Sequence, residues 1–179
     1  MGMLLRTFST RDKEPMIKMF NAYIRNKLEY CCTVWSPVEQ NYINDVEEIQ
    51  RIFTNKIRGL ERMDYHQRLS KLRLYSLERR RERYLIIYGW QQIEGIKENV
   101  LKLHTNNRGT SRRINLGSIN NKGTDGERIL PSVKTQILNS PARKIERLFN
   151  CMPPELRNIK GVKTVTFKIY LDEWLSRLP

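Results

Sequence analysis

The chain has little of what metal sites, disulfide frameworks and membrane spans require. Its three cysteines, Cys31, Cys32 and Cys151, show no C-x-x-C spacing, and its two histidines, His66 and His104, are far apart. Such spacing does not indicate a zinc site or a set of disulfides. No stretch approaches the roughly 20 apolar residues that span a bilayer. We therefore expect reduced thiols in an intracellular protein with no metal, no cofactor and no membrane partner.

Negative charge is also scarce. The 179 residues hold 33 Lys/Arg against 19 Asp/Glu, a net charge of +14. Residues 58–113 alone carry fourteen basic side chains against six acidic ones. A surface of this kind attracts phosphate backbones or anionic lipid, and with no apolar span the first is favoured. Nucleic acid is therefore the leading predicted partner.

Apolar residues recur at steps of three and four along most of the chain, which predicts a mainly α fold. Asp64, Ser76, Ser140 and Thr164 stand where helix N-caps are expected, and Pro141 suits a first helical turn. The predicted helices cover residues 12–35, 42–60, 64–72, 76–95, 140–151 and 164–178.

The composition changes in the middle of the chain. Between Thr105 and Gly126 it shifts to Asn, Gly, Ser and Thr, which is typical of a loop. Arg112 to Leu116 can form a short edge strand, but one weak alternation does not establish a sheet. We predict a helical domain over 1–103, a flexible basic linker over 104–138 and a C-terminal helical segment over 139–179.

Clustered arginines are the best candidates for phosphate contacts, because guanidinium groups bind phosphate oxygens in a forked geometry. Glu78 and Arg81 stand three apart, so a solvated helix face with ion pairs is the competing interpretation. The arginines from 108 onward fit an arm that orders on nucleic acid as well as they fit a linker. The predicted phosphate-binding residues are Arg68, Lys71, Arg73, Arg79, Arg80, Arg81, Arg83, Arg108, Arg112 and Arg113.

Aromatic residues interleave with this basic run. Tyr75, Tyr84, Tyr88 and Trp90 have the right types to stack on bases. Aromatics at helical spacing more often belong to a core, so we do not predict a stacking site.

Five stretches resemble one family in order and spacing: RTFSTR (6–11), LEYCCTVWSP (28–37), LYSLERRRERY (74–84), LFNCMPPELRN (148–158) and FKIYLDEWL (167–175). Together they are similar to the region that follows the polymerase active site in LINE-type, or non-LTR, retrotransposon reverse transcriptases. The resemblance spans nearly the whole chain. It implies that the first helices form a thumb-like bundle, the subdomain that grips the template and primer duplex. It also implies that the protein is nuclear if it follows its parent element.

One position departs from the pattern of these relatives. Similar sequences usually have proline where Asn26 stands, so we expect one continuous helix through Asn26.

The acidic residues of a polymerase are missing. Reverse transcriptases hold two metal ions on aspartates, one pair normally in a Tyr/Phe-x-Asp-Asp turn. The chain has no Asp-Asp dipeptide, and its aspartates are scattered at Asp12, Asp45, Asp64, Asp125 and Asp172. We predict a fragment that binds RNA or an RNA/DNA duplex without polymerase chemistry.

Two alternatives to that function remain open. The chain can be a helical protein-interaction module, or a remnant of a mobile element without a function. A thumb without its palm and fingers is expected to expose apolar helix faces and to self-associate through them. The residues predicted for those faces are Phe20, Trp35, Ile52, Leu171 and Trp174.

Overall fold

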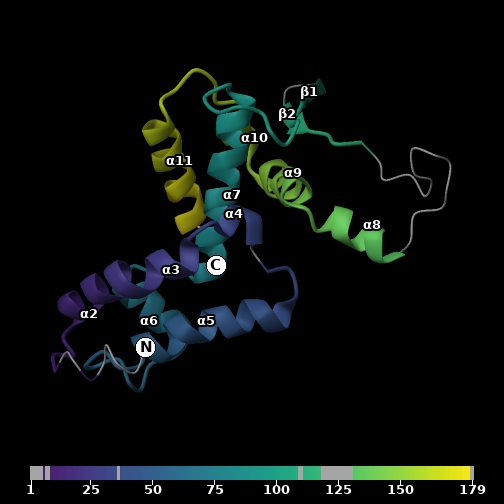
Figure 1. Ribbon diagram of the computed structural model, residues 1–179. Coiled ribbons are helices and arrows are strands. Elements are labelled where there is room, and N and C mark those ends of the chain that lie inside the picture. The colour runs from purple at the N-terminus through teal and green to yellow at the C-terminus, as the bar shows by residue number, and fades with distance from the viewer. Residues whose placement is uncertain (1–5, 7–8, 36, 109–110, 118–130, 178–179) are drawn as a thin grey trace. The chain divides into compact units, whose positions relative to one another are not determined.

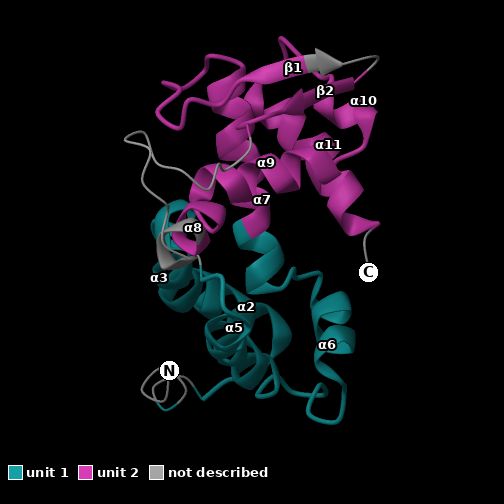
Figure 2. Ribbon diagram, turned by 90° about the vertical axis from the view of Figure 1, so that its right-hand side faces the viewer, with its two compact units in different colours: residues 1–81 teal, residues 82–179 magenta. Residues whose placement is uncertain are grey.

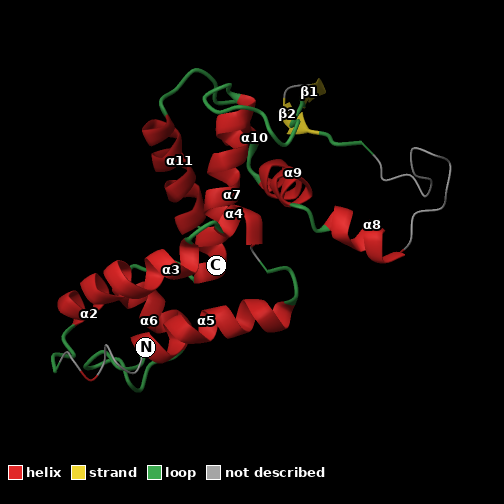
Figure 3. Ribbon diagram, viewed as in Figure 1, coloured by secondary structure: helices red, strands yellow, loops and turns green. Residues whose placement is uncertain are grey.

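The computed structural model describes residues 6, 9–35, 37–108, 111–117 and 131–177. The protein is mainly helical, as predicted, and its described strands form a two-stranded sheet (Figure 3). The chain divides into two compact units, Met1–Arg81 and Glu82–Pro179 (Figure 2). The sequence-based boundary at 103 follows a change of composition, whereas this division falls inside helix α7 (Leu77–Ile93).

Unit 1 contains helical segments, of which Figure 1 labels the α-helices. They are α2 (Lys13–Met19), the π-helical η1 (Phe20–Arg25), α3 (Asn26–Glu29), α4 (Cys32–Trp35), α5 (Gln40–Thr54), α6 (Tyr65–Leu72) and the first residues of α7.

The predicted helix over 12–35 is continuous through Asn26, which has helical backbone angles. It does not continue to Trp35. Tyr30 is extended and Cys31 has a φ of 51°, so the helix ends at Glu29 and α4 begins afresh at Cys32. The left-handed conformation of Cys31 gives no signal in an apolar pattern, which explains why the break was not predicted. Ser36, which follows the predicted helix, lies outside the described residues.

The core of unit 1 joins the first helices to α5 and α6. The rings of Phe20 and Phe53 lie 4.8 Å apart between centroids. On α5, Phe53 is 1% exposed and belongs to this core, whereas its neighbour Ile52 is 43% exposed. The core cluster consists of Met16, Met19, Phe20, Ile24, Phe53, Ile57, Leu60 and Leu72.

Helix α6 begins where its cap was predicted. The Asp64 carboxylate accepts a hydrogen bond from the His66 backbone N–H (3.0 Å), and Gln67 Oε1 accepts one from the Asp64 N–H (3.2 Å). The hydrogen bond from the His66 backbone to the carboxylate lowers the pKa of Asp64. The helix ends at Arg73, whose φ of 55° is left-handed. Local capping chemistry therefore sets both ends of α6.

Unit 2 contains the rest of α7 and the elements that follow it. They are β1 (Thr105–Arg108), β2 (Ser111–Ile114), α8 (Pro131–Leu138), α9 (Pro141–Cys151), α10 (Pro154–Arg157) and α11 (Thr164–Ser176). Ser140 caps α9 as predicted, its hydroxyl accepting from the Arg143 N–H at 3.4 Å. Helix α9 ends at Cys151, the end predicted for it, and Met152 and two prolines follow.

The predicted linker over 104–138 contains ordered structure. Strands β1 and β2 pair antiparallel, with Asn106 opposite Arg113, and α8 occupies the end of the segment. The far edge of β2 is hydrogen-bonded by side chains: Asn150 pairs with both backbone groups of Ile114 (3.0 and 2.9 Å), and Asn158 Oδ1 accepts from the Arg112 N–H (2.9 Å). The hairpin is thus held by residues distant in sequence, which local patterns cannot predict. Residues 118–130 lie outside the described part of the chain.

The core of unit 2 centres on α7 and α11. Trp90 stacks on Phe167 with centroids 4.3 Å apart and planes 4° from parallel. Trp90 is therefore a core residue, as its helical spacing favoured. Gly89 allows α9 to approach α7, because a Cβ built there would lie 2.3 Å from Cγ2 of Ile145.

Candidate nucleic-acid interface

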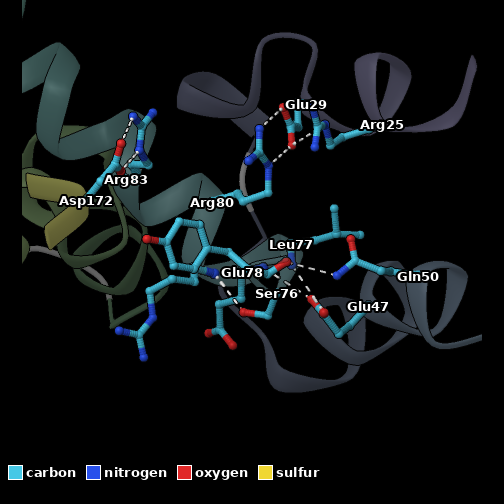
Figure 4. Close-up of polar contacts among 12 residues, drawn as sticks. Arg25, Glu29, Glu47, Gln50, Ser76, Leu77, Glu78, Arg80, Arg83 and Asp172 are labelled. Atoms are coloured by element: carbon cyan, nitrogen blue, oxygen red, sulfur yellow. Dashed lines mark hydrogen bonds and ion pairs between the residues drawn. The ribbon is translucent and has the colours of Figure 1, made fainter. Parts of the chain in front are cut away.

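The start of α7 carries the predicted arginine run, and its backbone is capped from within unit 1. Ser76 Oγ accepts from the Arg79 N–H at 3.1 Å, while the Glu47 carboxylate accepts from the N–H groups of Leu77 and Glu78, each at 3.2 Å (Figure 4). The first N–H groups of a helix attract anions, and Glu47 supplies the negative charge. This helix start is therefore closed to phosphate.

A buried network holds Glu47 in place. The Tyr65 hydroxyl donates to Glu47 Oε1, and Gln50 Nε2 donates to the Tyr65 oxygen (3.1 Å) and to the Tyr75 carbonyl (3.0 Å). Burial raises the pKa of Tyr65, and the hydrogen bond to Glu47 raises it further. The network joins α5 and α6 to the start of α7, and the side chains of Glu47, Gln50 and Tyr65 are buried.

Arg80 and Arg81 serve unit 1 in different ways. Arg80 forms a two-point ion pair with Glu29, with Nη2 to Oε2 at 3.1 Å, and Arg25 Nε lies 3.8 Å from the same carboxylate (Figure 4). Arg81 is 2% exposed, and burial lowers its pKa while Glu47 and nearby carboxylates favour its charge. Arg81 therefore lies inside unit 1, and the solvated helix face of the competing interpretation does not include it.

The remaining arginines of the run are Arg79 and Arg83. Arg79 is partly buried. Arg83 belongs to unit 2, where it forms a two-point ion pair with Asp172 of α11, with Nη2 to Oδ2 at 2.7 Å (Figure 4). Arg80 and Arg83 therefore each form an ion pair with a carboxylate of another helix.

Arg68 is buried and closes the end of α5. Its guanidinium donates to Thr54 Oγ1 (3.2 Å), to the Met63 carbonyl (2.6 Å) and to the Arg51 carbonyl (3.3 Å). A cation that satisfies the last carbonyls of a helix stabilises that helix end. The guanidinium of Arg68 is thus occupied within unit 1.

The hairpin arginines differ from one another. Arg112 is buried, forms an ion pair with Glu94 and lies over the ring of Phe149 at 5.9 Å. Arg113, the next residue on β2, is exposed because successive strand residues face opposite sides. Arg108 closes β1, and its side chain lies outside the described part of the structure.

Lys71 and Arg73 are the exposed members of the predicted set in unit 1. Both stand at the C-terminal end of α6. Lys13 Nζ donates to the Lys71 carbonyl at 2.9 Å, which brings a third cation there. Lys13, Lys71 and Arg73 form the α6 basic end. Cations at a helix C-terminus also favour the helix dipole, which is a structural reason for their presence.

Sequence reasoning did not single out Lys13 or Arg157. Lys13 reaches the α6 basic end only through folding, because 58 positions separate it from Lys71. Arg157 on α10 is 4% exposed, and its Nε and Nη1 have no hydrogen-bond partner among the described residues. Burial lowers its pKa, and the charge of Arg113 lowers it further. The local sequence around Arg157 does not indicate that this side chain is buried.

Comparison with protein-family models finds no match, and searches of curated proteins and of solved structures find no similar chain. In the described part of the chain, no helix is long and apolar enough to cross a membrane. No group of three His, Cys, Asp or Glu side chains that could hold a metal ion occurs among the described residues.

Proposed function

We propose that this chain is a nucleic-acid-binding segment of a LINE-type reverse transcriptase, corresponding to the thumb and the region after it. The proposal is supported by the five sequence stretches quoted above and by the charge of the chain. In this proposal the chain binds the phosphate backbone of RNA or of an RNA/DNA duplex. It acts in the nucleus together with its parent element.

The observation that carries this proposal is the excess of positive charge. An ion pair within the chain uses one cation and one anion, so internal pairing leaves the net charge of +14 unchanged. The pairs of Arg80, Arg83 and Arg112 remove those guanidinium groups from the surface charge together with their carboxylates. Phosphates of a nucleic acid can neutralise what remains, with release of their counterions.

The contacts are assigned to exposed side chains. In unit 1 these are Lys71 and Arg73 with Lys13, and in unit 2 Arg113. The other arginines of the predicted set have a structural role, because they hold together the elements that carry these cations. They are Arg68, Arg80, Arg81, Arg83 and Arg112. Arg79 and Arg108 stay predicted contacts.

Binding of a fluorescent RNA/DNA duplex to the full chain, followed by anisotropy, tests the proposal. Affinity is expected to fall by at least about tenfold between roughly 50 and 200 mM salt, with little dependence on sequence. Binding to a double-stranded DNA of equal length shows whether the chain prefers the RNA/DNA duplex. No binding at the low salt concentration, or binding that salt does not weaken, contradicts the proposal.

A second candidate function is a protein-interaction module, and α11 favours it. Val165 and Ile169 are 67% and 61% exposed and stand four apart on one face of that helix, with Tyr170 beside them. The faces predicted for self-association fare differently: Phe20 and Leu171 are buried, whereas Trp35 is 41% exposed. A complex that forms equally well with and without nucleic acid would favour this candidate.

No catalytic role is part of the proposal, because the chain has no Asp-Asp pair to hold the two metal ions. A primer-extension assay with magnesium and the purified chain is expected to show no nucleotide incorporation. Sustained incorporation would contradict it.

A further inference from the structure

Unit 2 has a groove between α10 and α11, and none of the phosphate contacts assigned above lies in it. Both helices belong to unit 2 (Figure 2), and the groove has a volume of about 450 Å³. This volume is within the range of sites that bind small ligands, roughly 300–1,000 Å³. The lining residues are Glu155 and Leu156 of α10, Ile159, Lys160 and Val162 of the connecting segment, and Tyr170 of α11.

The segment between the two helices is held in place by α7. The Gly161 N–H donates to Glu94 Oε2 (3.2 Å), and Trp90 Nε1 donates to the Ile159 carbonyl (3.5 Å). Gly161 has a φ of 67°, which glycine adopts without strain. Trp90 is itself fixed in the core of the unit by its stacking on Phe167. The groove therefore exists before a ligand binds, which lowers the entropy that binding costs.

The groove combines aliphatic walls with one exposed aromatic ring. Leu156, Ile159 and Val162 supply the aliphatic side chains, and Tyr170 is 45% exposed. A tyrosine ring that is half in solvent loses little on covering and gains from contact with another ring. Flat aromatic ligands, such as the bases of an unpaired strand, stack on side chains of this kind.

The charges at the groove restrict the ligand further. Lys160 lines the groove and is exposed. Lys163, the exposed N-cap residue of α11, stands seven positions before Tyr170, about two helical turns, and so lies on the same side of the helix. These two cations favour a ligand with negative charge. Glu155 is the acidic member of the lining, and its carboxylate accepts hydrogen bonds from N–H groups but repels other carboxylates.

A nucleotide has all the properties that this lining selects. Its base is flat and carries N–H donors, while its negative charge lies on a separate phosphate that can reach the lysines without approaching Glu155. An inorganic anion would gain nothing from the aliphatic walls, and an acidic peptide would bring its carboxylates toward Glu155.

We infer that the groove between α10 and α11 binds an unpaired base of a nucleic-acid strand. The base stacks on Tyr170, its N–H donors pair with the Glu155 carboxylate, and neighbouring phosphates contact Lys160 and Lys163. Guanine fits best, because the adjacent N–H donors on its Watson–Crick edge match the two oxygens of a carboxylate. The inference rests on the proposed function for the class of its ligand and adds a requirement for an unpaired base.

The experiment compares RNA/DNA duplexes that differ only at one end. One is blunt, and the others carry a short single-stranded overhang of guanines, of adenines or of abasic sugars. Guanine and abasic overhangs have the same phosphates, so the difference in their affinity for the full chain, measured by anisotropy, is due to the base. The guanine overhang is expected to bind at least about fivefold more tightly than the abasic one, with adenine between them. Equal affinities for guanine and abasic overhangs overturn the inference.

Substitutions locate the effect. Tyr170→Leu removes the ring and is expected to abolish the advantage of guanine over the abasic overhang, whereas Tyr170→Phe keeps it. Tyr42→Leu is the matched control, because Tyr42 is an exposed tyrosine of α5 (59%) outside the groove. Glu155→Gln is expected to lower the affinity for guanine to that for adenine. If Tyr170→Leu fails to fold, Glu155→Gln decides the question, since Glu155 is exposed.

The results separate this inference from the proposed function. Salt-sensitive binding of the blunt duplex without any advantage of a base supports the proposed function and overturns the groove. A guanine advantage that is unchanged in Tyr170→Leu places the base elsewhere and also overturns it. Guanine-dependent binding through Tyr170 that salt does not weaken, without binding of the blunt duplex, supports the groove and contradicts the proposed function. An amphipathic helical peptide of Leu and Glu that binds through Tyr170, while bases do not, would overturn the assignment to nucleic acid.

Discussion

Arginines only a few positions apart in this chain have different chemical roles, and the groups within reach of each guanidinium decide which. Arg80 faces Glu29, Arg68 faces backbone carbonyls, and Arg73 faces solvent at a helix end. When a carboxylate of the protein accepts two hydrogen bonds from a guanidinium, those forked donors are no longer available to a phosphate. Counting arginines in a basic run therefore overestimates the number of phosphate contacts that it offers.

Arg73 offers a way to remove charge without damage to the fold. Its φ of 55° is a conformation that glycine adopts without strain, so Arg73→Gly should leave stability unchanged or raise it by up to about 1 kcal/mol. Duplex affinity should fall, and the slope of log affinity against log salt should decrease by about 1. Lys27→Gln, an exposed charge on α3, is the control and should leave the slope unchanged. Equal slopes for both variants would remove Arg73 from the interface.

Tyr65 should make the stability of unit 1 sensitive to alkaline pH. Its pKa is raised in the folded state, so the hydroxyl is neutral in both states below the unfolded pKa of about 10 and stabilises fully there. Above that pH the unfolded state loses the proton first, and stability declines.

Tyr65→Phe removes the hydroxyl that donates to Glu47. It also removes the contribution of Tyr65 to the decline in stability at alkaline pH. We expect the variant to be about 1 to 3 kcal/mol less stable at neutral pH, with a difference that narrows above about pH 10. Urea unfolding at several pH values measures both effects. A constant difference across that range would mean that the raised pKa does not contribute.

At the scale of the element, helix starts and the hairpin follow different rules. The starts of α6 and α9 use side chains within three residues of the cap, Asp64 with Gln67 and Ser140. The hairpin uses Asn150 and Asn158, which lie 36 and 46 positions from their backbone partners on β2. These amides complete an edge that would otherwise present unpaired backbone groups. They also give two polar residues of the LFNCMPPELRN stretch a structural role.

Gly89 should be required for the packing of α9 on α7. Alanine is intrinsically the better helix former by about 1 kcal/mol, but its Cβ would lie 2.3 Å from Cγ2 of the fully buried Ile145. We expect Gly89→Ala to lower stability by about 1 to 2 kcal/mol in chemical denaturation, since overpacking outweighs the helix preference.

A double-mutant cycle separates this clash from a general loss of stability. Ile145→Ala alone should cost about 2 to 5 kcal/mol by leaving a cavity. The double variant should be more stable than the sum of the two effects by about 1 kcal/mol or more, because the new methyl group enters that cavity. Strict additivity would show that α7 and α9 do not meet at this glycine.

At the scale of the whole molecule, charge and exposed apolar side chains oppose one another. A net charge of +14 makes copies of the chain repel, whereas the exposed Val165 and Ile169 of α11 favour contact. Salt screens the repulsion over a Debye length of about 10 Å at 0.1 M and leaves the apolar contact in place.

Light scattering after gel filtration should therefore find a monomer at low salt and growing self-association as salt rises. Duplex binding should change in the opposite direction over the same range. The variant Ile169→Lys should stay monomeric throughout, and Lys168→Gln, its neighbour on α11, should behave like the unchanged chain. A stable oligomer at low salt would favour the protein-interaction function over nucleic-acid binding.

The sequence by itself determined the mainly α class, the starts of α6, α7 and α9, and the excess of positive charge. Each depends on neighbours within a few residues or on a count that folding cannot change. The tertiary structure decided which arginines form ion pairs and which stay exposed. The carboxylates that pair with Arg80, Arg83 and Arg112 are distant in sequence: Glu29, Asp172 and Glu94 lie 51, 89 and 18 positions away. It also decided that the Asn/Gly-rich segment contains a hairpin and that Arg157 is buried. Pairing and burial are properties of residues that folding brings together, and local spacing does not contain them.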